Sequence, residues 1–311
     1  MPKSLRNVTL SLSLTAILVL SFLYGCSYTP STMPWTGIPP ENLTQQQLQD
    51  ILSVSLEYHD HLDTYKLMVI SSVSTNVTGG LNPWQRSLHT SASGAKNLAE
   101  EQAQMTLDLS MIMQGMGQEG EEQSVIYDIY AKDNWIYVSM ATLNMGSYWV
   151  RVKRSGEIEE FFSFNAAEQQ MKMLSSTTNI EYLRTEKLNG VDCYVLSISP
   201  NKNELATWLD EQDTGYQNLD WQRVVDDAST FQDFNLYCYL AKDSYLVMKM
   251  SMVMILELTP DQAGVESSSF DRIQISLNRD IVLYDHNIPY TLTLPADAFA
   301  AKEVSSDIFL D

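Results

Sequence analysis

After Thr44 the chain alternates between apolar and polar residues with the period of an α-helix. Apolar or small residues fall three or four positions apart at Leu48, Ile51, Leu52, Ser55 and His59. Thr44 and Gln47 have the spacing of a capping box, in which two side chains bind backbone N–H groups at the start of a helix. The pattern therefore predicts an amphipathic helix over residues 44–62.

From Tyr65 onward the pattern changes to short runs of alternating residues, which is typical of half-buried β-strands. These runs cover residues 65–75, 104–114, 124–131, 134–141, 147–154, 179–187, 191–199, 234–241, 244–258 and 270–284. The segment between the first two runs contains Gly, Pro and Ser, and it predicts a connection. Helical patterns return at residues 203–211 and about 218–228. Strands joined by short turns pair antiparallel, so the sequence predicts an α+β domain with helices on one face of an antiparallel sheet.

Two of the predicted strands have a Met-rich apolar face. The first face consists of Met105, Leu107, Leu109, Met111 and Met113. The second consists of Leu246, Met248, Met250, Met252, Met254 and Leu256. Methionine is flexible and polarizable, and it suits surfaces that accept variable apolar shapes. Two interpretations stay open: these residues line a cavity that binds a lipid, or they pack as core beneath the helices.

The N-terminal residues have the organisation of an export signal. Lys3 and Arg6 form a basic start, and an apolar stretch follows over residues 8–24. This stretch is shorter than the ~20 residues that cross a bilayer as a helix. We therefore expect residues 1–25 to be a signal peptide.

The apolar stretch ends at Leu23-Tyr24-Gly25-Cys26, which resembles the bacterial lipobox. In that motif the cysteine receives a diacylglycerol thioether and becomes the mature N-terminus. We expect lipidation of Cys26, a Pro-rich tether over 26–42, and a single domain over 43–311. An ordinary signal peptide with an incidental cysteine and a short uncleaved anchor are the alternatives. The expected location is extracytoplasmic, with acyl chains anchoring the protein to the membrane.

Charge excludes several kinds of partner. The 311 residues include 19 Lys and Arg but 39 Asp and Glu, which gives a formal net charge of −20. Nucleic-acid binding needs clustered cations, so we expect no nucleic-acid partner. Electrostatic adhesion to anionic lipid is excluded on the same ground. A hydrophobic content of 44% is sufficient for a large core.

Enzyme signatures are scarce in this sequence. It contains no G-x-S-x-G, P-loop, G-x-G-x-x-G or H-E-x-x-H motif, so we expect no catalytic residues, no metal and no cofactor. Cys193 and Cys238 lie on predicted strands that can be neighbours, and export permits oxidation. A disulfide between them and two free thiols are both open alternatives, because register decides their distance.

The hairpin Leu188-Asn189-Gly190-Val191-Asp192-Cys193-Tyr194-Val195-Leu196 and the C-terminal Ile288-Pro289-Tyr290-Thr291-Leu292-Thr293-Leu294-Pro295 resemble segments of a known family. Both are similar to stretches of the LolA/LolB-like superfamily of bacterial lipoproteins, which includes LppX/LprG-type relatives. The resemblance implies a strongly curved antiparallel β-sheet, or half-open β-barrel, with helices packed on the concave face. It also implies a non-catalytic carrier of lipids or lipoproteins without a cofactor.

Two functions follow from these observations. The first is a membrane-anchored exported lipoprotein that binds or carries a lipid or acyl chain in an apolar concavity of the sheet. The alternative is a cell-envelope scaffold or sensor that binds a protein partner without a lipid, through exposed aromatic residues such as Trp35, Trp84 and Trp208.

Overall fold

The computed structural model describes residues 40–305, apart from 81–82, 116–119, 121, 143–145, 156–170, 172, 176, 178, 211–218 and 264–269. Residues Pro40–Asp311 form one compact unit. The expected signal peptide, Cys26 and nearly all of the expected tether lie outside the described residues.

Twelve strands and a few short helices make up the described fold. The helices are η1 (Pro40–Asn42), α2 (Gln45–Asp60), α5 (Lys202–Asp210), α6 (Trp221–Asp226), η2 (Ala228–Thr230) and η3 (Ala296–Ala300). The first strands are β1 (Thr64–Thr78), β2 (Trp84–Asn97), β3 (Gln102–Gly115), β4 (Glu122–Lys132), β5 (Trp135–Thr142) and β6 (Gly146–Lys153). The remaining strands are β7 (Asn179–Leu188), β8 (Val191–Ser199), β9 (Phe231–Ala241), β10 (Val247–Leu258), β11 (Arg272–Tyr284) and β12 (Lys302–Glu303).

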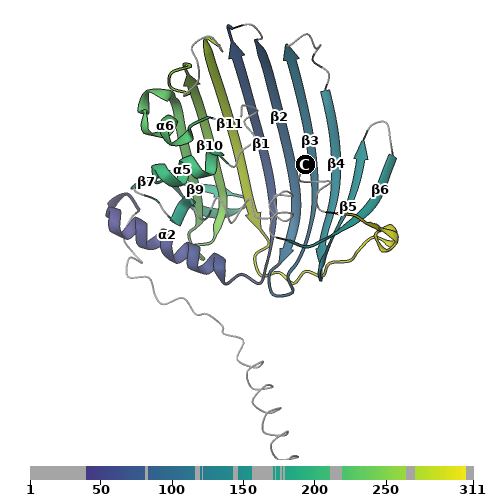
Figure 1. Cartoon of the computed structure of the whole chain (residues 1–311). Coiled ribbons are helices and arrows are strands. Elements are labelled where there is room, and N and C mark those ends of the chain that lie inside the picture. The colour runs from purple at the N-terminus through teal and green to yellow at the C-terminus, as the bar shows by residue number, and fades with distance from the viewer. Residues whose placement is uncertain are drawn as a thin grey trace, which may run out of the picture. The chain divides into compact units, whose positions relative to one another are not determined.

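All strands belong to one sheet, in the order β12-β6-β5-β4-β3-β2-β1-β11-β10-β9-β8-β7. Neighbours pair antiparallel except the short β12, which pairs parallel with β6. The sheet curves without closing, and β7 and β12 are its two edges (Figure 1). The predicted fold class, an α+β domain built on a curved antiparallel sheet that stays open, is therefore confirmed.

The predicted first helix is confirmed in position and in its start. The Thr44 N–H donates to Gln47 Oε1 at 2.9 Å, and the Gln47 N–H donates to Thr44 Oγ1 at 3.3 Å. Two backbone donors at the helix start are thereby satisfied, as a capping box requires. The buried residues of α2 are those of the predicted apolar face: Leu48, Ile51, Leu52, Ser55 and His59.

The hairpin at Asn189-Gly190 forms where the sequence predicts it. Leu188 on β7 pairs with Val191 on β8, so these two residues make the whole turn. Both have positive φ values, 50° at Asn189 and 89° at Gly190. A type I′ turn needs this backbone at both central positions, and Asn followed by Gly adopts it with the least strain.

One central strand was not predicted. Residues 84–97, expected as a connection, form β2 between β1 and β3. The strand is rich in Ser, Thr, Gly and Ala, which have little apolar signal, and hydrogen bonds to two neighbouring strands stabilise it. At Gly94 a Cβ would lie 2.3 Å from the carbonyl oxygen of Gln104, so only glycine fits this crossing.

The C-terminal stretch expected as a closing strand adopts another structure. Residues 288–295 lie outside any strand and cross the ends of β1 and β2. Thr64 Oγ1 donates to the carbonyl oxygen of Ile288 at 2.7 Å, and Asn97 Nδ2 donates to that of Tyr290 at 3.1 Å. The two prolines in this stretch remove ladder donors, which is a physical reason for its irregular path.

The helices α2, α5 and α6 lie against the part of the sheet that contains β7 to β10 (Figure 1). The Arg279 guanidinium of β11 lies 5.4 Å from the ring centre of Trp208 in α5, which identifies the face that α5 covers. We call this helix-bearing side of the sheet the inner face and the opposite side the outer face.

Candidate functional site

The register of the sheet places both predicted Met-rich stripes on the inner face. Met252 of β10 pairs with Arg279 of β11, and Arg279 pairs with Ser71 of β1. Ser71 pairs with Thr90 of β2, which pairs with Leu109 of β3. Directly paired residues point to the same side of a sheet. One face therefore runs from the β10 stripe to the β3 stripe across three intervening strands.

The β10 end of this face is packed core. Its central side chains, Met250, Met252, Met254 and Leu256, are all 0% exposed. Both α2 and η2 contact β10, and α5 lies over the neighbouring Arg279. A side chain that borders an open cavity keeps some accessible surface, so these four residues border none in this conformation. They match the core interpretation of the stripe.

Two members of the β10 stripe do not lie on the inner face. Leu246 precedes the strand, and a bulge between Val247 and Lys249 interrupts the alternation. A bulge adds one residue and reverses the side to which the next side chain points. Met248 consequently packs in a cluster with outer-face residues: Cys193, Val195, Tyr239 and Ala241. The prediction that Leu246 and Met248 extend the stripe is wrong.

The β3 stripe changes from buried to open along its length. Met105 and Leu107 are only 3% and 5% exposed. Leu109, Met111 and Met113, further along the same face, are each partly exposed. This half of the predicted site is therefore the accessible half.

Neighbouring strands extend the accessible half into one apolar surface. Leu88 pairs with Met111, Val125 pairs with Leu109, and Met140 pairs with Tyr127. All of these side chains are partly exposed. We call this surface the open patch; it consists of Leu88, Leu109, Met111, Met113, Val125, Tyr127 and Met140.

The sequence contained only part of the signal for the open patch. The alternation over 124–131 marks Val125 and Tyr127 as one face of a strand, but only the register shows that this face continues the β3 stripe. Leu88 lies in the strand that was expected as a connection, so no pattern identified it.

Two arginines also lie on the inner face. Arg86 of β2 pairs with Thr75 on one side and with Met113 of the open patch on the other. Its Nε donates to the sulfur of Met111 at 3.3 Å, which places its guanidinium at the patch. Arg279 lies deeper, under α5, and its Nε donates to Ser71 Oγ at 3.4 Å.

Burial lowers the pKa of Arg279 to about 10, so this guanidinium remains protonated at neutral pH. Trp208 stacks against it and is itself only 4% exposed. The expectation that Trp208 is an exposed aromatic is therefore wrong. Trp84 is partly exposed, and Trp35 lies outside the described residues.

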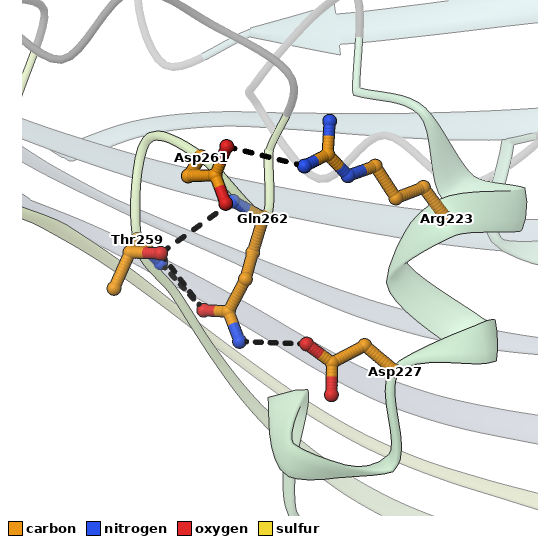
Figure 2. Close-up of polar contacts among 5 residues, drawn as sticks. All are labelled: Arg223, Asp227, Thr259, Asp261 and Gln262. Atoms are coloured by element: carbon orange, nitrogen blue, oxygen red, sulfur yellow. Dashed lines mark hydrogen bonds and ion pairs between the residues drawn. The ribbon is translucent and has the colours of Figure 1, made fainter.

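Polar contacts hold α6 and η2 against the end of β10 (Figure 2). Arg223 Nη2 of α6 contacts Asp261 Oδ1 at 3.2 Å. Gln262 Nε2 donates to Asp227 Oδ2 at 3.0 Å, and Gln262 Oε1 accepts from the Thr259 N–H at 3.0 Å. Hydrogen bonds from Ser229 and Gln262 lower the pKa of Asp227. We call these five residues the α6 clamp.

Cys193 and Cys238 are both buried free thiols. Their strands, β8 and β9, are neighbours as expected, but Cys193 pairs with Ala241 while Cys238 pairs with Leu196. The two thiols are thus three register positions apart, an odd number, and point to opposite faces of the sheet. The disulfide alternative is therefore wrong for this fold.

Within the described residues, no group of three or more His, Cys, Asp or Glu side chains is arranged to hold a metal ion. Among the same residues, no helix is long and apolar enough to cross a membrane.

No protein-family model matches this chain, and no curated protein matches it in sequence. Solved structures do match. The chain is similar to lipoprotein LppX from Mycobacterium tuberculosis, with 13% identity and a TM-score of 0.40 over 80% of this chain and 100% of that one. It is also similar to LprF from Mycobacterium bovis, with 12% identity and a TM-score of 0.36 over 81% and 98%.

A third match is a putative outer membrane lipoprotein-sorting protein domain from Vibrio parahaemolyticus, with 9% identity and a TM-score of 0.21 over 81% of this chain and 95% of that one. LppX belongs to the group of lipoproteins that the hairpin at Asn189-Gly190 resembles. Because these identities and TM-scores are low, the function proposed below rests on the residues of this chain.

Proposed function

We propose that this protein is a non-catalytic lipoprotein that binds a lipid or acyl chain on the open patch. The observation that carries the proposal is the contrast along one face: the β10 half is sealed under helices, while the β3 half presents contiguous apolar side chains that stay partly exposed. Contiguous apolar surface that remains accessible is typical of a binding site. Methionine at Met111, Met113 and Met140 suits a chain without fixed shape.

The proposal includes an anchor outside the described residues. Cleavage after residue 25 would leave Cys26 to carry the acyl chains, residues 26–42 as tether and residues 43–311 as the exported domain. The lipobox-like motif and the basic, apolar start support this. Replacing Cys26 by Ser should move the protein from the membrane pellet to the soluble fraction after cell fractionation. Retention in the pellet after a high-salt wash would contradict lipid anchoring.

The binding test uses residues 27–311, produced with an export signal and then delipidated. Native mass spectrometry before delipidation should show one lipid-sized mass increment, and organic extraction should identify the lipid class. The delipidated protein should take up a fluorescent fatty acid with a saturable signal. A bare chain mass together with no uptake would overturn the proposal.

A matched pair of variants tests the location. Leu109→Asp places a charge in the open patch and should abolish uptake, because burying a carboxylate against an acyl chain is costly. Ile126→Asp places the same charge on the outer face of β4, where Ile126 is 42% exposed, and should leave uptake unchanged. Equal loss in both variants would show that the lipid binds elsewhere or that uptake follows stability.

A further inference from the structure

Charges are segregated between the two faces of the central sheet. The structure describes every residue of the six strands β1, β2, β3, β4, β10 and β11. The pairing register places each acidic side chain of these strands on the outer face: Asp108, Glu122, Asp128, Glu257 and Asp280. Contacts among them agree, since Glu257 pairs with Arg272 at 2.9 Å and Asp280 with Lys249 at 2.9 Å, both on that face.

The inner face of the same strands has the opposite sign. Its charged residues are Arg86, Lys96 and Arg279. Lys96 lies at the end of β2, whereas the two arginines lie within the strands. In a chain with a formal net charge of −20, a central face that carries cations and no carboxylate is a local reversal of sign.

Arg86 is the cation that adjoins the open patch. Its neighbours across the sheet are Met113 and Thr75, and its Nε donates to the sulfur of Met111 at 3.3 Å. A thioether is a weak acceptor, whereas a carboxylate or phosphate forms a charge-assisted and often bidentate bond with a guanidinium. An anion at this position would therefore bind more strongly than the sulfur does.

Hydroxyl groups add donors beside this cation. Thr75 lies next to Arg86, and Thr90 lies next to Leu109 of the open patch. The site thus combines an apolar surface for a chain with cationic and hydroxyl donors at one border.

We propose that the ligand is an anionic amphiphile, whose acyl chain covers the open patch and whose terminal carboxylate or phosphate binds Arg86. This inference rests on the proposed lipid-binding function and narrows its ligand class. Charge complementarity selects this occupant over a neutral lipid, because the open patch alone would accept either.

The test measures affinities of the delipidated protein by calorimetry for oleate, oleoyl lysophosphatidic acid and monooleoylglycerol, which share one chain and differ in headgroup charge. Inorganic phosphate alone is the fourth probe. The two anionic lipids should bind about tenfold more tightly than the neutral one, the effect of one hydrogen bond to a charged group. Inorganic phosphate should show no binding, because it lacks the chain.

Variants of Arg86 locate the effect. Arg86→Gln should weaken binding of the two anionic lipids about tenfold and leave monooleoylglycerol unchanged. Arg86→Lys keeps the charge and should retain most of the preference. Arg272→Gln removes the same charge from the outer face, where its partner Glu257 also lies, and should behave like the unaltered protein. Urea unfolding of each variant checks that it is folded.

The outcomes separate the two proposals. Equal affinity for all three lipids, or equal weakening of all three by Arg86→Gln, would overturn the anionic ligand and leave lipid binding intact. Binding of inorganic phosphate that depends on Arg86 would overturn the amphiphile in favour of a free anion. Failure of all three lipids to bind would overturn the proposed function itself.

Discussion

Met252 and Leu109 belong to one row of laterally paired residues on the inner face, yet Met252 is fully buried and Leu109 is partly exposed. The same kind of apolar stripe therefore serves two purposes at the two ends of the row. Helices cover the β10 end and make it core. At the β3 end the side chains retain accessible surface, which makes them the candidate ligand contacts.

Two methionines on this face should respond differently to truncation. Met252→Ala should lower the free energy of unfolding by about 2–5 kcal/mol, because it removes a fully buried side chain and leaves a cavity. Met111→Ala should cost less than about 1.5 kcal/mol, because Met111 is partly exposed and its site can relax. Urea denaturation followed by Trp fluorescence measures both. Equal losses would mean that the two ends of the row are packed alike.

The two cysteines should remain reduced and unreactive. Burial raises the pKa of both thiols, most strongly that of Cys238, so neither is a thiolate at neutral pH. We expect residues 27–311 to react with a thiol reagent only after unfolding, and then at both cysteines. An oxidant should leave the mass of the folded protein unchanged. Loss of two mass units on oxidation would show a disulfide and contradict the register of β8 and β9.

The stability of the domain should fall at mildly acidic pH because of His286. Burial, and secondarily the nearby His59, lowers the pKa of His286 from 6.5 to about 4, while a backbone hydrogen bond and Asp285 oppose the shift. The unfolded state therefore binds a proton more readily. This contribution is complete above pH 6.5 and is lost as the pH falls from 6.5 to about 4, with a total of about 3 kcal/mol.

A variant series isolates this titration. His286→Gln should flatten the dependence of the unfolding free energy on pH between about 6.5 and 4. His89→Gln alters an exposed residue on the outer face of β2 and should leave the dependence as it was. An unaltered slope in His286→Gln would assign the acid sensitivity to another group.

The α6 clamp should control local opening of the helices over the core. Gln262→Ala removes the hydrogen bond to Asp227 and the cap on Thr259, so amide hydrogen exchange in α6 and η2 should become faster. Exchange in β1 to β4 should not change. Gln274→Ala, at an exposed outer-face position of β11, is the matched control. Faster exchange throughout the sheet would indicate global destabilisation in place of local opening.

Local chemistry was readable from the sequence. The capping box at Thr44 and the Asn189-Gly190 turn depend on neighbours a few residues apart, so their residue types suffice to predict them. The alternation over 104–114 and 250–256 likewise identified two apolar faces. Each of these signals is complete within one element.

Relations between elements were not readable in the same way. The bulge that turns Met248 to the outer face depends on pairing with β9, and the faces of Cys193 and Cys238 depend on the register of β8 with β9. Which apolar stripe becomes core depends on where α2 and α5 pack. Arg86 gave no signal, because its position beside Met111 and Met113 exists only once β2 and β3 are paired.

The open edges of the sheet determine how the protein can adjust to what it holds. A closed barrel has a fixed girth, because widening it would break a ladder of backbone hydrogen bonds. Here β7 and β12 end the sheet, so its bend can relax or tighten while every strand keeps its partner. Side-chain packing, and not the backbone, then sets the cross-section beside the open patch. One such chain can accommodate guests of unequal thickness at little cost in hydrogen bonding.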